Sequence, residues 1–330
     1  MALPMTPPLA APEFLARSGW GEAQILPLAG DASFRRYFRV IAQGRKAVLM
    51  DAPPPHEDPR PFVNVAEHLI GIGLRAPAIL ACDLDAGLLL IEDFGDHRMR
   101  EIVDADLSCE ADIYCGVVDV LIELHRHAPA KLPRHGLDDW ISEVGLFTKW
   151  YCPQLGLRID ESGFRRAWRE VLAPIDCSSE RWVTELRDYH AENVMLTDGR
   201  GTARYGLLDF QDARVGHPAY DLVSMLQDAR RDVSPAIEAR MLAHYMEETA
   251  RQPVFANAYW ALGAQRNTRI LGLFVRLWKR DGKPTYRAFQ SRMWRLLERD
   301  LAHPALLPLR TWFDANIPAE ARGVAWAQYA

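Results

Sequence analysis

The chain has 330 residues, of which 49% are hydrophobic and 25% charged, a composition that is ordinary for a globular protein. Its net charge of −5 excludes a broad basic surface of the kind that binds nucleic acid. Five scattered cysteines form no C-x-x-C pair, and no apolar run approaches the length of a membrane span. The amino terminus lacks the pattern of a secretory signal, so we expect a cytoplasmic protein without nucleic-acid or membrane partners.

The first part of the chain is predicted to be rich in β-structure. A short helix is expected near residues 12–18, followed by a hairpin and a further strand over 25–51, where apolar and polar positions alternate in part. A helix is predicted over 61–73, because its apolar residues repeat at helical spacing. Two more strands should follow, on either side of a turn at 83–87.

After about residue 97 the pattern becomes that of long helices. Two short strand-like pieces interrupt them, over 181–196 and 203–212. This order predicts an α+β protein with a small first lobe over 1–92, a connector at 93–97 and a large second lobe over 98–330. The helical segments are predicted at 108–128, 139–151, 161–173, 218–230, 234–250, 254–280 and 284–302.

The sequence DYHAEN contains the one spacing that points to chemistry. Asp188 and Asn193 fit D-x4-N, and Asp209 follows 16 residues after Asn193 at the end of an apolar strand. Phosphoryl transfer needs a carboxylate near the attacking hydroxyl and oxygen ligands for magnesium. We predict that Asp188 accepts the hydroxyl proton and that Asn193 and Asp209 bind Mg²⁺. Caps and turn residues are the alternative, and the strand that ends in Asp-Phe favours the catalytic interpretation.

Several longer segments carry a family resemblance. They resemble the aminoglycoside phosphotransferase/choline kinase superfamily and, more closely, the anomeric N-acetylmuramate/N-acetylglucosamine kinases of cell-wall recycling. The resemblance implies a protein-kinase-like fold of two lobes, with a nucleotide-binding first lobe and a catalytic, substrate-binding second lobe. It also implies ATP as donor, Mg²⁺ as cofactor and an amino sugar as acceptor. The segments are GDASFRRYFRV (30–40), MDAPP (50–54), LRDYHAEN (186–193), LLDFQDARVGHPAYDLVSMLQDARRDV (207–233) and QRNTRILGLF (265–274).

The resemblance also assigns roles to individual residues. Asp188 matches the catalytic base, and Asn193 and Asp209 match the metal ligands. Asp221 matches an aspartate to which we assign a structural role in bracing the catalytic loop, although a carboxylate stabilised by a helix dipole is an alternative. The nucleotide-covering turn would be formed by Gly30, Asp31, Ala32, Ser33 and Phe34.

The tripeptide Asp93-Phe94-Gly95 spells the magnesium loop of protein kinases but lies in the wrong place. It precedes Asp188, whereas the metal aspartate must follow the D-x4-N segment. We therefore predict that Asp93 marks the hinge between the lobes. There the backbone of Glu92, Asp93 and Phe94 would contact the adenine, and Asp209 would be the metal ligand.

Two positions depart from the kinase pattern. Leu186 stands where the superfamily usually has a histidine, and a leucine can preserve its packing. The strand AVLMD has Met50 or Asp51 where a lysine is expected, although Glu67 is placed to be its glutamate partner. We expect one of two nearby arginines to bind the phosphates in its place, and strand alternation does not decide between them. These are Arg35 and Arg36, and the alternative is that both are solvated strand residues.

The sugar should be recognised by polar side chains and an aromatic platform. The lactyl carboxylate of N-acetylmuramate suits an arginine, although each candidate could instead be structural. The predicted function is that of an ATP-dependent sugar 1-kinase. A kinase for an aminoglycoside or choline and a nucleotide-binding pseudokinase remain as alternatives. The candidate substrate-binding residues are His190, Glu192, Gln211, Arg230, Arg266 and Asn267, with Trp140 or Trp150 for stacking.

Overall fold

The computed structural model describes residues 5–28 and 34–329, which cluster into two compact units. The first unit contains Met1–Leu107 together with Glu192–Asp212, and the second contains Ser108–Ala191 and Ala213–Ala330. The first unit therefore includes a segment that comes from the second half of the sequence. Residues 93–97, the predicted connector, lie within the first unit by this division.

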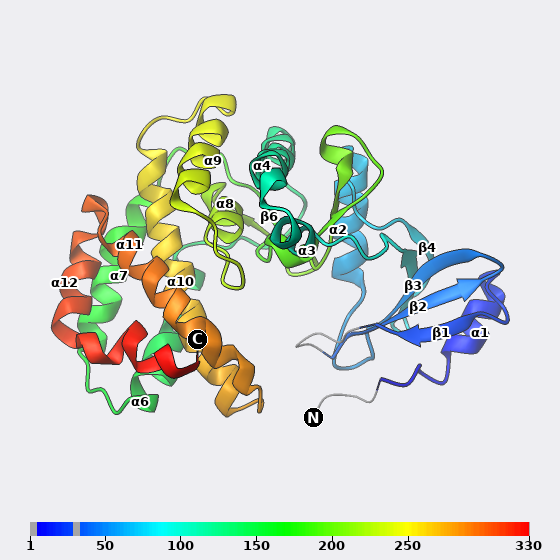
Figure 1. Cartoon of the computed structure of the whole chain (residues 1–330), viewed down its shortest axis with the longest axis horizontal. Coiled ribbons are helices and arrows are strands. Elements are labelled where there is room, and N and C mark those ends of the chain that lie inside the picture. Colours follow the sequence, from blue (N-terminus) through cyan, green and yellow to red (C-terminus); the bar gives the residue numbers. More distant parts are fainter. Residues whose placement is uncertain (1–4, 29–33, 330) are drawn as a thin grey trace. The chain divides into compact units, whose positions relative to one another are not determined.

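The first unit is built on an antiparallel sheet of five strands (Figure 1). Strands β2 and β3 are joined by the two-residue turn Gln43-Gly44, whose φ angles of 51° and 77° are those of the turn that suits a hairpin twist. The hairpin and the further strands predicted from the sequence are present. In spatial order the strands are β1 (Gln24–Pro27), β2 (Arg36–Ala42), β3 (Arg45–Asp51), β5 (Leu88–Glu92) and β4 (Ile79–Asp83).

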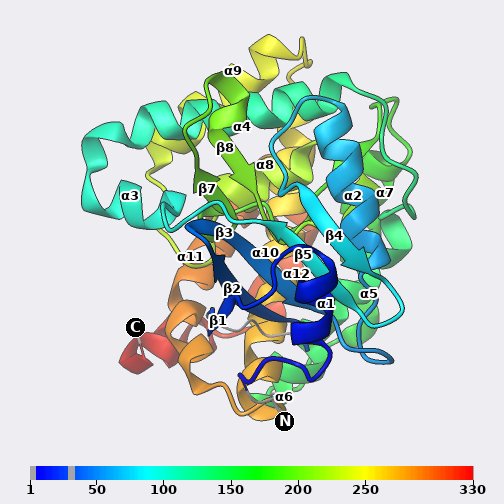
Figure 2. The ribbon, with the colours of Figure 1, turned by 90° about the vertical axis from the view of Figure 1, so that its right-hand side faces the viewer.

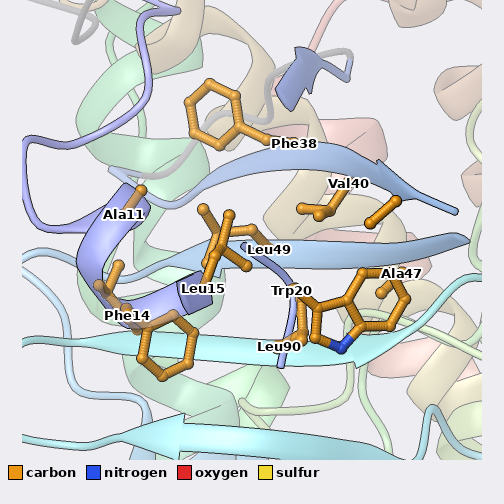
Figure 3. Packing of buried hydrophobic residues seen from close by; sticks show 11 residues of the cluster. Ala11, Phe14, Leu15, Trp20, Phe38, Val40, Ala47, Leu49 and Leu90 are labelled. Atoms are coloured by element: carbon orange, nitrogen blue, oxygen red, sulfur yellow. The ribbon is translucent and has the colours of Figure 1, made fainter. Parts of the chain in front are cut away.

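One face of this sheet is covered by α1 (Ala11–Arg17), as Figure 3 shows. Phe14 and Leu15 of the helix belong to one buried cluster with Phe38, Val40 and Leu49 of the strands. Burying side chains of this size stabilises a fold by roughly 1.5–3 kcal/mol each. The alternate residues of the central strands point to the opposite face and are also buried, among them Val48, Met50, Leu89 and Ile91.

A second hairpin joins the first unit through its backbone. Strands β7 (Val194–Leu196) and β8 (Tyr205–Leu207) pair with each other, and β7 lies beside α3 (Met99–Ala105; Figure 2). The amide of Leu196 donates to the carbonyl of His97 at 2.7 Å. On the other strand, the amide of Leu207 donates to the carbonyl of Arg75 at 2.8 Å, four residues after α2 (Arg60–Gly71) ends. Both strands of the hairpin are thus tied to the first unit.

The second unit is mostly helical, as predicted (Figure 1). Its strands β6 (Val183–Glu185) and β9 (Arg214–Gly216) form a short antiparallel pair. No helix in residues 5–28 or 34–329 combines the length and the apolar character needed to cross a membrane. The helices are α4 (Glu110–Arg126), α5 (Leu137–Leu146) with a π-helical turn at Phe147–Tyr151, α6 (Cys152–Gln154), α7 (Glu161–Asp176), α8 (Ala219–Leu226), α9 (Pro235–Glu248), α10 (Phe255–Lys279), α11 (Gln290–Leu301) and α12 (Leu307–Asn316).

Helix α10, the longest, packs against α5, α8 and α11 within this unit. At Gly272 this helix approaches the backbone of another helix closely. A Cβ atom built on Gly272 would lie 2.2 Å from the carbonyl carbon of Leu146, where α5 passes into the π-helical turn. Only a glycine therefore fits at this crossing.

Gly272→Ala should destabilise the protein by about 2 kcal/mol or more, because backbone rather than a flexible side chain occupies the space of the added methyl group. Gly145→Ala in α5 is the matched control, since a Cβ there meets nothing within 4 Å. The control should be neutral or stabilise by up to about 1 kcal/mol through helix propensity. Urea unfolding of both variants measures the difference, and equal stabilities would contradict the packing described.

Candidate functional site

In the first unit the β7–β8 hairpin brings Asn193 and Asp209 together. Val194 pairs with Leu207, and the amide of Leu208 donates to the carbonyl of Asn193 at 2.9 Å. Asp209 follows directly, and its Oδ2 atom accepts a hydrogen bond from Asn193 Nδ2 at 3.3 Å. The two residues predicted as metal ligands are therefore neighbours in space, although 16 residues separate their positions in the sequence.

The backbone of Asp209 is in the left-handed region, with φ at 58°. For a residue other than glycine this conformation costs on the order of 1–2 kcal/mol, and such strain clusters at functional sites. Two neighbours hold it in place. The Gln211 amide donates to Asp209 Oδ1 at 2.9 Å, and the ring of Phe210 stacks on Phe62 of α2 at 4.9 Å between centroids.

These two side chains suit a magnesium ion. Mg²⁺ prefers carboxylate and amide oxygens at about 2.1 Å, and adjacent ligands of an octahedral ion lie about 3 Å apart. The contact of 3.3 Å between Asn193 and Asp209 is close to that spacing. A half-turn of the Asn193 amide would put its oxygen where its nitrogen lies, so both residues fit the ion.

The two arginines that are candidates for binding the phosphates have different surroundings. Arg36 is tied to Asp51, its partner across the strand pair, with its Nε atom donating to Asp51 Oδ2 at 2.8 Å. Arg35 precedes the strand, and its guanidinium lies 3.6 Å from Asp209 Oδ1 and 3.6 Å from Glu57 Oε2. Arg35 is thus next to the candidate metal ligand, and Glu57 is a residue that the sequence analysis missed.

Some of the remaining candidates for nucleotide binding lie outside the described part of the chain. Gly30, Asp31, Ala32 and Ser33 lie outside the described residues. Phe34 stacks on His56 at 4.9 Å, and Glu67 is exposed on α2.

At the predicted hinge, all three side chains have partners in the first unit. Glu92 pairs with Arg75, whose guanidinium lies 5.0 Å from the centre of the Phe94 ring. The Asp93 carboxylate accepts hydrogen bonds from Arg39 Nε at 2.6 Å and from the Gly95 amide at 2.8 Å. Asp93 thereby ties the end of β5 to β2.

In the second unit Asp188 lies on a loop that Asp221 braces. The backbone amides of Leu186 and Arg187 donate to the two oxygens of Asp221 at 2.6 and 2.8 Å. Arg187 is left-handed, with φ at 70°, so the residue before Asp188 carries the same strain as Asp209. The side chain of Leu186 is buried. Burial and the charge of Glu185 raise the pKa of Asp221, and the two amide donors oppose that rise.

Positive side chains surround Asp188. Its burial would raise the pKa of the carboxylate, but the charges of Arg269, His190 and Arg266 outweigh that effect and lower the pKa. Arg269 also lies 3.7 Å from Glu143, which forms an ion pair with Arg187. Arg266 is almost fully buried in α10, yet its Nε and Nη1 atoms have no hydrogen-bond partner within the described part of the chain. Buried guanidinium nitrogens without hydrogen-bond partners are costly, so these two atoms are candidates for binding an anionic or oxygen-bearing ligand.

A buried acid–base network that the sequence did not reveal supports this region. His135 Nδ1 lies 2.7 Å from Glu185 Oε1, and its Nε2 lies 3.4 Å from Glu143 Oε2. Burial lowers the pKa of His135, but the two carboxylates outweigh burial and raise it to about 9. Burial would raise the pKa of Glu143, but the positive charges of Arg269, His135 and Arg187 outweigh burial and hold this pKa far below its usual range.

The predicted sugar-binding residues divide between the two units. In the second unit, His190 Nε2 lies 3.1 Å from Arg230 Nη1, and both belong with Arg266 to the polar region that contains Asp188. Asn267 instead donates to Gln227 at 2.7 Å and to Asp300 at 2.8 Å, within a buried network.

Three of the other candidates, Glu192, Gln211 and Trp140, have structural partners. In the first unit, Glu192 pairs with Arg100 and Gln211 supports Asp209. In the second unit, Trp140 is buried against Trp182 with 5.9 Å between ring centroids, and Trp150 is half-buried.

Comparisons with known proteins bear on this arrangement. The sequence profile described as the phosphotransferase enzyme family matches residues 24–254. An N-acetylmuramate/N-acetylglucosamine kinase of Caulobacter vibrioides is 36% identical, over 94% of this chain and 96% of that protein. A protein of the same name from Pseudomonas aeruginosa is 35% identical, over 88% of each chain.

Two solved structures show the same fold. A choline/ethanolamine kinase family protein from Mesorhizobium loti gives a TM-score of 0.64 at 16% identity, covering 92% of this chain and 97% of that one. An ADP-bound aminoglycoside phosphotransferase gives a TM-score of 0.56 at 13% identity, covering 83% of this chain and 92% of that one. These likenesses confirm the predicted α+β, protein-kinase-like fold.

Asp209→Ala should weaken the binding of a divalent cation at least tenfold, because it removes the only carboxylate of the proposed ligand pair. Mn²⁺ titration with ADP present, followed by electron paramagnetic resonance, measures this affinity. Asp93→Ala is the control from the look-alike tripeptide, and it should retain the affinity while losing the anchor on Arg39. Loss of Mn²⁺ binding in Asp93→Ala, with binding kept in Asp209→Ala, would reverse the assignment.

The network around His135 should make stability depend on pH. Its folded pKa of about 9 exceeds the unfolded value of about 6.5. The stabilisation is therefore complete below pH 6.5 and is lost as pH rises through 9. The difference in unfolding free energy between wild type and His135→Gln should shrink by on the order of 2–3 kcal/mol over that range. Urea unfolding at pH 6, 7.5 and 9 tests this, and a difference that does not change with pH would refute it.

Proposed function

The chain belongs to the phosphotransferase enzyme family, and on that premise we propose that it is an ATP-dependent kinase for the anomeric hydroxyl of N-acetylmuramate and N-acetylglucosamine. Relatives that bear the name of this activity align over nearly the whole chain. Peptidoglycan recycling is the process in which such an enzyme would act.

In this proposal Asp188 orients the acceptor hydroxyl and takes its proton. The arginines around Asp188 lower its pKa, so the carboxylate is ionised and ready to accept a hydrogen bond at neutral pH. A weak base suffices, because an anomeric hydroxyl is more acidic than other sugar hydroxyls. Asp221 holds the loop on which Asp188 is carried.

Asn193 and Asp209 would hold magnesium together with the phosphates of ATP. Bound there, the ion would neutralise the charge that develops on the transferring phosphoryl group. Gln211 keeps Asp209 oriented, and only four residues separate Asp188 from Asn193 in the sequence. A pseudokinase has no chemical need for these three residues together, which favours an active enzyme.

The observation that favours a neutral or anionic acceptor is the positive charge around Asp188. Arg187, Arg266 and Arg269 all contribute to lowering its pKa. A cationic aminoglycoside or choline would be repelled by such surroundings, whereas a neutral or anionic sugar would not. Arg266 adds donors that have no partner in the described chain. A carboxylate can accept two parallel hydrogen bonds from one guanidinium, and N-acetylmuramate carries such a group on its lactyl arm.

Arg266→Gln should therefore reduce kcat/KM for N-acetylmuramate about tenfold to a hundredfold more than for N-acetylglucosamine, because a charged hydrogen bond contributes about 1.5–3 kcal/mol. Arg276→Gln, ten residues further along the same helix, should leave the ratio of the two specificity constants unchanged. Arg266→Lys keeps the positive charge, so it should lose less kcat/KM for N-acetylmuramate than Arg266→Gln does if the charge of Arg266 binds the carboxylate. Equal losses for both sugars in Arg266→Gln would contradict the role in carboxylate binding.

A panel of acceptors tests the function as a whole. ADP release should be seen with Mg²⁺, ATP and either amino sugar, and not with choline or kanamycin. Asp188→Asn should reduce turnover at least a thousandfold while nucleotide still binds, because the neutral amide cannot accept the proton. Turnover of the cationic acceptors alone would establish the runner-up. Nucleotide binding without turnover of any acceptor would indicate a pseudokinase.

A further inference from the structure

Strand β3 has no cation at the position where kinases carry a phosphate-binding lysine. Met50 and Asp51 are both buried at the end of the strand, and Lys46 is exposed near its start. In protein kinases this lysine contacts the nucleotide phosphates and pairs with a helix glutamate. A replacement must therefore come from another element of the first unit, near the metal-binding aspartate.

We propose that Arg35 replaces this lysine and that Glu57 replaces its glutamate partner. The Arg35 guanidinium lies between two carboxylates, with Nη1 3.6 Å from Glu57 Oε2 and Nη2 3.6 Å from Asp209 Oδ1. Its side chain is only 10% exposed. Since Asp209 is the candidate ligand of the phosphate-bound magnesium, a cation at this distance from it lies where the phosphates must be bound.

Glu57 contacts both the backbone next to Arg35 and the Arg35 side chain. Its Oε1 atom accepts a hydrogen bond from the backbone amide of Phe34 at 3.1 Å, while Oε2 faces the guanidinium. Glu57 is therefore a positioning residue for Arg35. By contrast Glu67, the partner predicted from the sequence, is exposed on α2.

The loop that carries Glu57 is fixed by the neighbouring backbone. The amide of Glu57 donates to the carbonyl of Pro53 at 3.1 Å. The amide of Ala52 donates to the carbonyl of Gly87 at 2.8 Å, where a Cβ on Gly87 would lie 2.1 Å from the Ala52 oxygen. Glu57 therefore lies in the segment 50–58 (MDAPPPHED), on the loop that follows β3. The start of this loop is hydrogen-bonded to the turn between β4 and β5.

The guanidinium of Arg35 is positively charged in these surroundings. An arginine guanidinium stays protonated at every physiological pH, and the carboxylates of Glu57 and Asp209 face it. Arg36, the other candidate, faces Asp51 across the strand pair and donates to the carbonyl of Thr6 at 3.0 Å. Its surroundings are those of a strand ion pair. A guanidinium can donate two parallel hydrogen bonds to phosphate oxygens, whereas a lysine ammonium binds phosphate as a point charge.

The inference rests on the proposed nucleotide-dependent function, and nucleotide binding tests it without any acceptor. Isothermal titration of the full chain with Mg-ATP, Mg-ADP and adenosine measures the phosphate-dependent part of the affinity. Arg35→Ala should weaken ATP and ADP at least tenfold and leave adenosine within twofold. Arg35→Lys should recover part of the loss. Arg45→Ala, an exposed arginine at the start of β3, is the control and should bind all three like wild type.

Glu57→Gln keeps an oxygen for the Phe34 amide but removes the charge beside Arg35. It should raise KM for ATP severalfold while KM for the sugar and the melting temperature stay near wild type. Two results would overturn the inference: Arg35→Ala binding Mg-ATP like wild type, or losing adenosine as strongly as ATP. If wild type turns over neither amino sugar and yet Arg35→Ala loses ATP selectively, the sugar assignment fails and this inference stands.

Discussion

The two hydrogen bonds from the backbone to Asp221 are the interaction on which the catalytic loop depends. They hold Leu186 and Arg187 at 2.6 and 2.8 Å and so fix Arg187 in a left-handed conformation. The conformation costs on the order of 1–2 kcal/mol, and a hydrogen bond contributes about 0.5–1.5 kcal/mol, so the two bonds together contribute about 1–3 kcal/mol. The two bonds together therefore offset the strain. Without them the loop could relax, and Asp188 would lose its direction.

The same fixed backbone places the Arg187 side chain on Glu143, and from there the charges extend through the second unit. Glu143 contacts His135 and Arg269, and His135 contacts Glu185. Each of these buried charges is tolerated because an opposite charge lies beside it. Arg266 differs in its hydrogen bonds: its charge acts on Asp188, but two of its nitrogens have no hydrogen-bond partner in the described chain. In our account that uncompensated donor set is kept for the substrate.

Much of this organisation could be predicted from local patterns. The hairpin that joins Asn193 to Asp209 follows from an apolar strand on each side of a polar loop, and the pairing of Val194 with Leu207 has that form. The helices follow from apolar spacing of three and four residues. The position of Asp93 before the catalytic segment was enough to separate it from the metal ligands, and its ion pair with Arg39 gives it a structural role.

What could not be predicted depends on contacts between distant segments. The choice between Arg35 and Arg36 rests on where β2 begins, and alternation alone does not mark the first residue of a strand. Glu57 belongs to a proline-rich loop whose path no periodicity describes. Arg266 and Asn267 are adjacent in the sequence, but helical geometry turns successive side chains by about 100°, so one lies near Asp188 and the other near Asp300.

The site of phosphorylation on the product tests the central claim most directly. Wild-type protein, Mg-ATP and N-acetylmuramate should yield a sugar phosphate whose phosphorus couples to the anomeric proton in a ¹H–³¹P correlation spectrum. A product whose phosphorus couples to the protons at C6, or to any other ring position, would contradict the account of an anomeric kinase.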